Sequence, residues 1–324
     1  MAEPSLQSPF AEVRWIWKNG ELVEFEKATV HVLSHALHYG SGVFEGIRCY
    51  QTPDGPAVFR LPDHARRLVV SAGVYRMELP WSQGQIAEAI LDTIRANGLS
   101  QCYIRPLVIR GFSPQGLGVN PLRSPIEMII ATWPWGKYLG EEAQERGVDI
   151  CVSSWCRPSP NTLPSMAKAT GNYLNGQLIK MEAVTNGYAE GVALDPQGNV
   201  SEGSGENIFL VFGNTLLTAP SAASLLPGIT RDSVLHIARD LGLEVREQSI
   251  PRGHLYTCDE LFFAGTAAEI TPVRSVDRIE VGDGRPGEIT RRILREYLAV
   301  AEGKAPDRRG WLTPVGAPVA HSVP

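Results

Sequence analysis

The sequence predicts a mixed α/β protein with two domains. Short β-branched or alternating runs bounded by Gly, Pro and Asn predict strands, and capped amphipathic runs between them predict helices. The chain has 324 residues, 43% of them hydrophobic and 20% charged, which is enough for one large or two ordinary domains. A segment framed by Pro134 and Gly140 carries two aromatic residues and is the best boundary. We therefore expect a small domain over 1–133, an interdomain loop over 134–142, and a large domain over 143–324.

The elements of the first domain follow from local signals. Asn19-Gly20 between two apolar runs predicts a hairpin turn. Ser82 and Gln85 form a capping box ahead of a helix whose isoleucines recur at helical spacing. Pro62-Asp63 suits the start of another helix. The remaining strands are expected at 28–32, 46–50, 57–60, 102–110 and 126–133.

The elements of the second domain are predicted in the same way. Lys168 is expected to open a helix that ends at Asn186-Gly187. Thr230 is a plausible N-cap of a later helix, and a last helix is expected over 288–301. Beyond Ala305 the chain is rich in Pro and Gly, which predicts a poorly ordered tail. Strands are expected at 148–155, 191–195, 200–211 and 260–265.

Composition argues against several classes of protein. The net charge is -5 and no basic tract is present, so we expect no nucleic-acid partner. The most apolar run, 126–133, is too short to span a bilayer. The chain starts Met-Ala-Glu-Pro without a signal-like segment, which favours the cytoplasm. Five cysteines are scattered without metal-site spacing, so we expect no metal.

Two basic features of the first domain allow more than one interpretation. Arg66 and Arg67 point about 100° apart on their helix, so only one can reach inward as an anion clamp, and spacing does not say which. Tyr103 and Arg105 share one face of a strand and could receive a carboxylate. An edge strand with a solvated arginine is the alternative, which Pro106 also permits.

The stretch from Met166 to Phe209 carries the chemistry. Lys168, Tyr173 and Glu202 supply an amine nucleophile, a phenol and a carboxylate. These groups can form a Schiff base with pyridoxal phosphate, contact its ring hydroxyl and keep its pyridine nitrogen protonated. Downstream, the helix start at Ile229-Thr230 and the small-residue turn at Thr266 are candidate anion sites, although ordinary helix capping would give the first pattern too.

Taken together, these motifs resemble the branched-chain-amino-acid aminotransferases, within the fold-type IV pyridoxal-phosphate enzymes. Six motifs occur in the family's order and cover the chain from about Trp15 to about Leu312. They are His35-Ala-Leu-His-Tyr39-Gly-Ser-Gly-Val-Phe44-Glu-Gly-Ile-Arg48, Tyr103-Ile-Arg105-Pro106, Lys168-Ala-Thr-Gly-Asn-Tyr173, Ser201-Glu202-Gly-Ser-Gly-Glu-Asn207, Pro227-Gly-Ile-Thr-Arg-Asp232 and Gly265-Thr-Ala-Ala-Glu269.

The resemblance implies a fold and a set of roles. The fold is a small α/β domain followed by a larger pseudo-barrel domain, with the active site between them and near a dimer interface. Lys168 is the Schiff-base lysine and proton shuttle, Tyr173 contacts the ring oxygen, and Glu202 pairs with the pyridine nitrogen. The cofactor is pyridoxal 5'-phosphate, and its phosphate is held by Arg67, Ile229, Thr230 and Thr266. The substrate pocket is formed by Tyr39, Phe44, Tyr103, Arg105, Trp135, Tyr138 and Ala267.

The activity implied is transamination between branched-chain L-amino acids and 2-oxoglutarate, with ping-pong kinetics, in a homodimer or a hexamer built from dimers. Arg105 with Tyr39 would take the side-chain carboxylate of glutamate, and the aromatic residues would pack an aliphatic side chain. The alternatives are D-amino-acid aminotransferases, R-selective amine transaminases and aminodeoxychorismate lyases, which share the lysine and glutamate. A non-catalytic binding module on the same fold is a further alternative, against which the intact lysine, tyrosine and glutamate argue.

Overall fold

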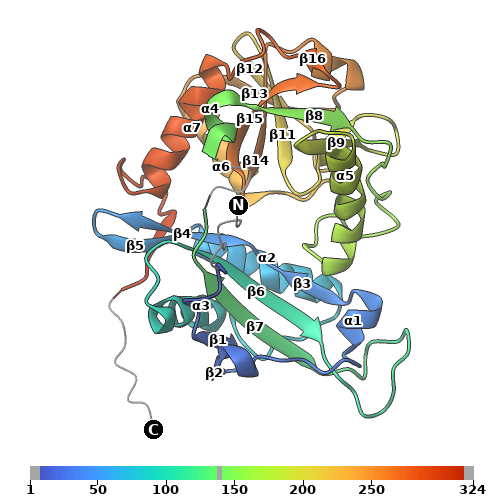
Figure 1. Cartoon of the computed structure of the whole chain (residues 1–324), viewed down its shortest axis with the longest axis vertical. Coiled ribbons are helices and arrows are strands. Elements are labelled where there is room, and N and C mark those ends of the chain that lie inside the picture. Colours follow the sequence, from blue (N-terminus) through green and yellow to red (C-terminus); the bar gives the residue numbers. More distant parts are fainter. Residues whose placement is uncertain (1–7, 137–140, 317–324) are drawn as a thin grey trace, which may run out of the picture. The chain divides into compact units, whose positions relative to one another are not determined.

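The computed structural model describes residues 8–136 and 141–316, and the chain divides into two compact units (Figure 1). The first unit is formed by residues 1–136 together with 301–324, and the second by residues 137–300. Each unit is built around its own sheet. Tyr138 lies outside the described residues.

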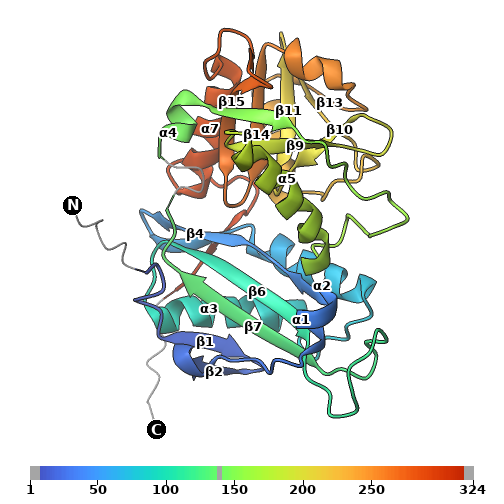
Figure 2. The ribbon, with the colours of Figure 1, turned by 45° about the vertical axis from the view of Figure 1, so that its right-hand side comes forward.

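The first unit contains an eight-stranded sheet with the order β17-β5-β4-β6-β7-β1-β2, in which β3 also pairs with β6 (Figure 2). The strand β6 is central, because β3 and β4 pair with it on one side and β7 on the other. The strands are β1 (Trp15–Lys18), β2 (Glu21–Glu24), β3 (Gly42–Phe44), β4 (Ile47–Thr52), β5 (Gly55–Phe59), β6 (Cys102–Arg110), β7 (Ile126–Trp133) and β17 (Leu312–Pro314).

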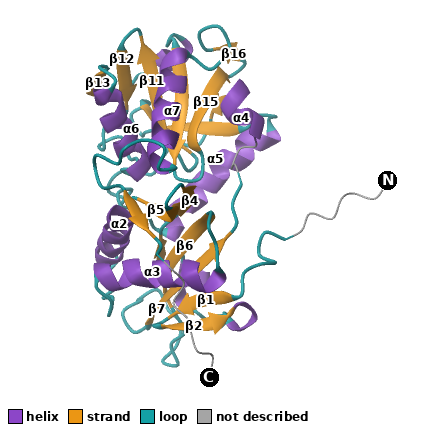
Figure 3. Ribbon diagram, turned by 90° about the vertical axis from the view of Figure 1, so that its left-hand side faces the viewer, coloured by secondary structure: helices purple, strands orange, loops and turns teal. Residues whose placement is uncertain are grey.

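Local sequence signals account for much of this unit. Asn19 and Gly20 both have positive φ, at 52° and 108°, and join β1 to β2 as a two-residue hairpin turn. The helices are α1 (His35–Tyr39), α2 (Leu61–Val74) and α3 (Gln83–Asn97), and a 3-10 turn spans Phe25–Lys27. The predicted capping box is confirmed, since the Ser82 hydroxyl accepts from the Gln85 N–H and the Gln85 side chain accepts from the Ser82 N–H. Figure 3 shows α2 and α3 packed against the sheet, on which α3 contacts β1 and β7.

The end of the chain differs from the expectation. Leu312–Pro314 forms β17, which pairs antiparallel with β5. Trp311 and Val315 flank this strand and are buried, so the segment contributes apolar surface to the first unit. For the described residues 306–316, the expectations of a poorly ordered tail and of membership in the large domain are therefore wrong. The strand has three residues, one of them Pro314, so its pairing with β5 gives the segment its structure rather than its own propensity.

The second unit contains a nine-stranded sheet that closes on itself. Its order is β10-β9-β8-β15-β14-β11-β12-β13, and β10 also pairs with β11, so six strands form a ring. This closure is the pseudo-barrel that the family resemblance implies. The strands are β8 (Val148–Val152), β9 (Glu190–Leu194), β10 (Val200–Gly203), β11 (Asn207–Phe212), β12 (Thr215–Thr218), β13 (Glu244–Glu247), β14 (Glu260–Gly265), β15 (Glu269–Val276) and β16 (Ile279–Glu280).

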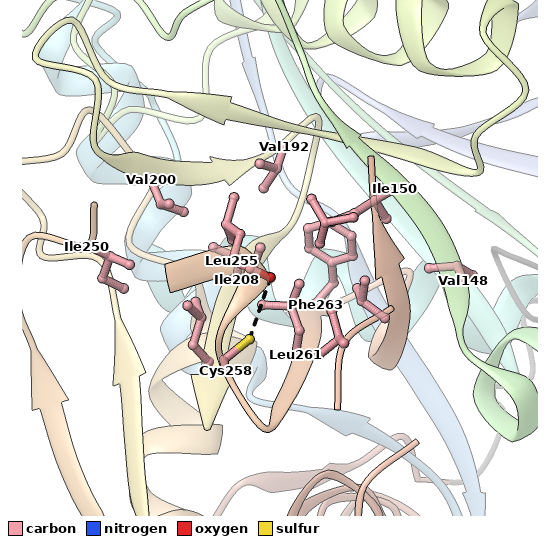
Figure 4. Packing of buried hydrophobic residues seen from close by; sticks show 14 of the residues in the cluster. Val148, Ile150, Val192, Val200, Ile208, Ile250, Leu255, Cys258, Leu261 and Phe263 are labelled. Atoms are coloured by element: carbon pink, nitrogen blue, oxygen red, sulfur yellow. Dashed lines mark hydrogen bonds between the residues drawn. The ribbon is translucent and has the colours of Figure 1, made fainter. Parts of the chain in front are cut away.

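Alternate residues of the ring strands point inward and form the core of this unit. Ile150, Val192, Ile208 and Phe263 are all fully buried, each from a different strand of the ring (Figure 4). The inward side chains are branched or aromatic, which suits the pleated surface of a small barrel. The rigid barrel wall therefore positions the residues at its rim.

Helices cover the outside of the ring. They are α4 (Glu141–Arg146), α5 (Tyr173–Thr185), α6 (Ile229–Asp240) and α7 (Glu288–Ala301), with 3-10 turns at Thr170–Asn172 and Arg252–Tyr256. The helix α5 packs on β9, α6 on β13 and β14, and α4 on β15. In the described part of the chain, no helix combines the length and the apolar character needed to cross a membrane.

Candidate functional site

Lys168 lies just before α5, on a segment that is held by its neighbours. The side-chain amide of Asn172 donates to the carbonyls of Pro164 and Ala167, at 3.1 and 3.2 Å. These bonds keep the segment irregular, so the helix begins at Tyr173 and the expectation that Lys168 opens it is wrong. The Lys168 amine donates a hydrogen bond to the Tyr173 hydroxyl at 2.6 Å. The predicted amine and phenol therefore meet directly.

Glu202 lies on β10 and is buried with three hydrogen-bond donors on its carboxylate. Arg157 forms an ion pair with Oε1 at 2.9 Å. The Asn207 amide and the Leu226 N–H both donate to Oε2, each at 3.1 Å. A register shift between Val200 and Glu202 interrupts the pairing with β9 at this point, which is a common way to redirect a side chain beside a site.

The electrostatics of Glu202 combine burial with nearby cations. Burial raises the pKa of this carboxyl above its ordinary value, while Arg157 and Lys168 act in the opposite direction. A carboxylate has about four acceptor positions, and here Oε2 has two donors and Oε1 has one. One acceptor position on Oε1 therefore remains for a cationic N–H, which is the donor that a protonated pyridine ring presents.

One cavity in the second unit collects these groups. Two walls of this cavity come close together at Gly176, where a Cβ would lie 2.4 Å from the Ser204 carbonyl oxygen. Only glycine therefore lets α5, which begins with Tyr173, pack against the turn that follows Glu202. The cavity is lined by Arg157, Ser165, Ala167, Lys168, Asn172, Tyr173, Glu202, Ser204, Gly205 and Leu226.

The predicted phosphate residues of this unit lie at two backbone features. The helix α6 begins at Ile229 with Gly228 as its N-cap, and no side chain caps its first N–H groups. Thr230 is thus inside the helix, and the expectation that it is the N-cap is wrong. Leu226, which lines the cavity, leads directly to this helix start. Helix N-termini of this kind bind phosphate readily.

Thr266 and Ala267 form the tip of the hairpin between β14 and β15. The last paired residues of these strands are Gly265 and Glu269, so the turn between them is three residues long. Glu269 has a positive φ of 54°, as expected where a tight hairpin closes. Both Thr266 and Ala267 are partly exposed, which leaves their backbone groups accessible to a ligand.

Arg67 lies in the first unit, on α2, and is turned toward Glu45. Its Nε donates to Glu45 Oε1 at 2.6 Å and its Nη2 to Oε2 at 2.8 Å. Arg66 is exposed on the neighbouring face. Of the two arginines that the sequence left open, Arg67 is therefore the one that reaches inward.

The first unit also gathers four of the predicted substrate residues. The Arg105 guanidinium donates to the Tyr103 hydroxyl at 3.0 Å and stacks over the Phe44 ring, 4.7 Å from its centroid. Trp135 packs on Tyr103 with ring centroids 4.8 Å apart. Because β6 is paired on both sides, the edge-strand interpretation of Arg105 is wrong.

Tyr39 ends α1 and packs on His35. The centroids of the two rings lie 4.6 Å apart, and 45% of the surface of Tyr39 is exposed. The His35 ring bonds to the Ser41 hydroxyl and to the Gly118 carbonyl. Both ring nitrogens of His35 therefore have hydrogen-bond partners within the first unit. The predicted residues thus fall into one set in each unit, with Lys168, Tyr173 and Glu202 together in the second.

Arg157 and Asn207 were not predicted from the sequence. Asn207 stands directly opposite Glu202 in the β10–β11 pairing, because the stretch expected as one strand over 200–211 is two strands joined by a turn, and that expectation is wrong. Arg157 follows β8 in a loop with three prolines, and no local pattern distinguishes it. Only the packing of β9, α5 and β10 brings its partners Leu194, Asn175 and Glu202 around it.

Comparison with known proteins agrees with the geometry. The family described as amino-transferase class IV matches residues 42–276. The branched-chain-amino-acid aminotransferase of Salmonella typhimurium is 53% identical over 304 residues, which cover 94% of this chain and 98% of that protein. The crystal structure of the Escherichia coli branched-chain amino acid aminotransferase is similar with a TM-score of 0.92 at 52% identity, covering 94% of this chain and 100% of that one.

A second similar structure is a holo-form. It is the branched-chain amino acid aminotransferase of Thermobaculum terrenum in its PLP-form, with a TM-score of 0.85, 39% identity, and coverage of 94% of this chain and 98% of that one. The family match covers more than half of the chain, and the similarities extend over nearly all of it. The resemblance inferred from six motifs is confirmed: the chain belongs to the class IV aminotransferases, a family of pyridoxal-phosphate-dependent enzymes.

Proposed function

We propose that this enzyme transfers the amino group between branched-chain L-amino acids (Leu, Ile and Val) and 2-oxoglutarate, with ping-pong kinetics. The observation that carries the proposal is the cavity in which Lys168 donates to Tyr173 while Glu202 keeps an acceptor position on Oε1. The similar proteins named as branched-chain aminotransferases support the substrate class.

The residues present fit pyridoxal 5'-phosphate. Lys168 would hold its aldehyde carbon, Tyr173 its ring oxygen and Glu202 its ring nitrogen, while Arg67, Thr266 and the α6 start at Ile229 and Thr230 would hold its phosphate. When bound, the cofactor supplies an electrophilic carbon and a ring that accepts electrons. The orphan N–H groups at the start of α6 and the unused acceptor position on Glu202 are the features of this chain that match it.

The roles of the chain's own groups follow from their contacts. When neutral, the Lys168 amine is both a nucleophile, which would hold the cofactor's aldehyde carbon, and a base, which would take the proton from the substrate α-carbon and return it to that aldehyde carbon. The Tyr173 hydroxyl holds that amine at hydrogen-bond distance and so limits its motion. Glu202 would keep a proton on the ring nitrogen, since a buried carboxylate gains most by bonding to a cation.

For the substrate side chain, the first unit offers one arginine within aromatic surroundings. Arg105 between Tyr103 and Phe44 can pair with the second carboxylate of glutamate, and the rings of Phe44, Tyr103 and Trp135 can pack an aliphatic side chain. We include Tyr39, Tyr138 and Ala267 in the substrate set on the family resemblance. This dual character would let one pocket serve both half-reactions.

The first experiment replaces Lys168. Lys168→Ala should abolish transamination and should leave no borohydride-reducible covalent link between protein and cofactor, because no other residue that lines the cavity is an amine. The matched control is Lys27→Ala, an exposed lysine that pairs with Glu24, which should retain both properties. Substantial turnover by the Lys168 variant would reject the proposal.

The second experiment separates the related activities. Cofactor absorbance is followed while the holoenzyme is mixed with single L-amino acids, D-amino acids and primary amines. We expect L-leucine, L-isoleucine, L-valine and L-glutamate each to change the cofactor absorbance through a half-reaction. A response confined to D-amino acids or amines would favour a different class IV enzyme, and a colourless protein would favour a binding module.

We also propose that the enzyme is a homodimer or a hexamer built from dimers. In the first unit, α1 and the loop after β6 are joined by the bond from His35 to the Gly118 carbonyl and by ring contact of His31 with Phe112. Several of their large apolar side chains are exposed, namely Val32, Leu33, Leu37, Phe112, Leu117, Val119 and Leu122. Such patches favour protein contacts. Leu37→Glu with Val119→Glu should lower the mass found by light scattering, and an unchanged mass would reject this surface.

A further inference from the structure

Glu45 is a fully buried carboxylate that the proposed reaction does not use. It directly follows β3 and has no exposed surface. Arg67 forms two hydrogen bonds with it: Nε donates to Oε1 at 2.6 Å, and Nη2 donates to Oε2 at 2.8 Å. His64 adds a third bond between Nδ1 and Oε2 at 2.7 Å. The two partners are three residues apart on α2, so they approach from one face of that helix.

These bonds fix the orientation of Arg67 and also give the buried Glu45 carboxylate its hydrogen-bond donors. A guanidinium bound at two points to one carboxylate has a fixed plane, unlike one held by a single bond. Burial alone would raise the pKa of Glu45, but Arg67 and His64 overcome it and hold that pKa far below its ordinary value. The carboxylate is therefore charged at neutral pH and stays bound to the arginine.

The exposure of the pair is uneven. The Glu45 side chain is inaccessible, whereas the Arg67 side chain retains 14% of its surface. The carboxylate is thus inaccessible, while part of the Arg67 side chain reaches the surface of the unit. An arginine that binds an anion needs such access, and a carboxylate that only orients it does not.

The neighbours of Glu45 contact the other arginine of the predicted site. Phe44 lies under the Arg105 guanidinium, and a Cβ at Gly46 would lie 1.9 Å from the Tyr103 hydroxyl. Between them, the Glu45 N–H donates to the Pro106 carbonyl at 2.9 Å. The segment Phe44–Gly46 is therefore a common support for Arg67 and for the Tyr103–Arg105 pair.

We propose that Glu45 is a positioning residue that orients Arg67 to receive a phosphate monoester, and that the segment Phe44–Gly46 holds the two anion-binding arginines of this unit in one fixed relation. This inference rests on the proposed function, in which Arg67 binds the cofactor's phosphate. It adds a residue that would touch neither cofactor nor substrate.

The test measures how strongly the protein prefers the phosphorylated ligand. Cofactor-depleted protein is titrated with pyridoxal phosphate and, separately, with pyridoxal, and the ratio of the two dissociation constants is the phosphate preference. Glu45→Gln should lower this preference roughly tenfold, as replacing a residue that orients a binding group commonly does. The affinity for pyridoxal should stay unchanged.

A double-mutant cycle separates positioning from general damage. Arg67→Ala should remove most of the phosphate preference, and adding Glu45→Gln to it should then have no further effect, because Glu45 acts through Arg67. The matched control is Asp63→Asn, which breaks a 2.6 Å ion pair with Arg60 at the start of the same helix and should leave the preference intact. Losses that simply add in the double variant would overturn the inference.

The outcomes also distinguish this inference from the proposed function. If Arg67→Ala leaves the phosphate preference intact, the assignment of Arg67 to the phosphate fails. If Arg67→Ala lowers it and Glu45→Gln does not, only the inference about Glu45 fails. If Glu45→Gln shows no cooperative thermal transition, Glu45→Asp is tested in its place. This variant keeps the charge and withdraws the carboxylate by one methylene. A preference unchanged in Glu45→Asp would overturn the inference as well.

Discussion

Two buried glutamates, one in each unit, show opposite electrostatic behaviour. Glu45 is bound by Arg67 and His64, and its pKa is held far below the ordinary value. Glu206 follows the turn after β10, where burial and the nearby Glu190 raise its pKa to about 8. Its carboxylate accepts the Gly205 N–H at 3.1 Å, while Lys180, the cation that lowers its pKa, bonds to Glu190 instead. Equal burial therefore does not decide the charge; the partner within bonding distance does.

Glu202 stands between these two cases. It has an arginine partner, as Glu45 does, but burial still raises its pKa above the ordinary value. Its three partners, Arg157, Asn207 and Leu226, come from separate segments and include one cationic side chain, whereas both partners of Glu45 lie on α2. The difference suits a carboxylate that meets a cationic ligand, as opposed to one that fastens an arginine.

The largest expected effect is on the paired carboxylate. Glu45→Ala should lower the free energy of unfolding by about 3–5 kcal/mol, because it removes the carboxylate that balances the charge of Arg67 and that bonds to the buried His64, and it leaves a cavity. Urea unfolding of the cofactor-depleted protein measures this. A loss below about 1 kcal/mol would mean that the ion pair contributes as little as an exposed one.

The sign of the pH dependence provides a second check on the same residue. A carboxyl whose pKa is lowered on folding contributes stability above the unfolded value of 4.5, and this contribution is lost as the pH falls below it. The gap in stability between the native protein and the Glu45→Ala variant should therefore narrow on acidification.

The next largest effect is expected in catalysis. Glu202→Gln keeps the shape but removes the charge that would hold a proton on the ring nitrogen, so kcat for L-leucine should fall by roughly 10²–10³, as for other preorganised electrostatic groups. Stopped-flow absorbance of the half-reaction measures it. Glu206→Gln, in the turn region that follows Glu202, is the control and should retain most activity.

Glu206 should respond to pH in the opposite direction from Glu45. Its raised pKa means that the folded protein keeps a proton that the unfolded chain has released between pH 4.5 and about 8, so stability falls as the pH rises through this window. Glu206→Gln should therefore gain stability relative to the native protein by up to about 1.4 kcal/mol per pH unit there. Thermal midpoints at pH 5 and pH 8 test this, and a gain that is the same at both would contradict it.

The smallest effect is expected where both partners are exposed. Glu24 and Lys27 form an ion pair at 3.0 Å with side chains that are 57% and 70% exposed. Glu24→Gln should change the free energy of unfolding by less than about 0.5 kcal/mol, because solvent and salt screen such a pair. A larger change in urea unfolding would show that proximity matters more than burial, and would weaken the contrast among the glutamates.

The local features of this protein could be predicted because each depends on a few neighbouring residues. The Asn19-Gly20 turn needs two residues that accept positive φ, and the Ser82–Gln85 box needs only one helical turn. The roles proposed for Lys168, Tyr173 and Glu202 came from residue types and the family's motif order, and the structure brings these three residues to one cavity.

Other features depend on chain closure and could not be read from short spacings. Two examples are β17, which forms only because β5 is available to pair with it, and Arg157, which finds Glu202 through the packing of three separate elements. The start of α5 at Tyr173 likewise depends on the bonds from Asn172 to Pro164 and Ala167.

Residue types and their order were enough to propose which groups carry the chemistry and to predict most of the elements on which they lie. Which buried carboxylates are charged was settled by the fold, because charge in a low-dielectric interior depends on partners within a few ångströms. Glu45 and Glu206 are the same residue type, and their pKa values shift in opposite directions because Arg67 bonds to Glu45 while no cation bonds to Glu206 among the described residues.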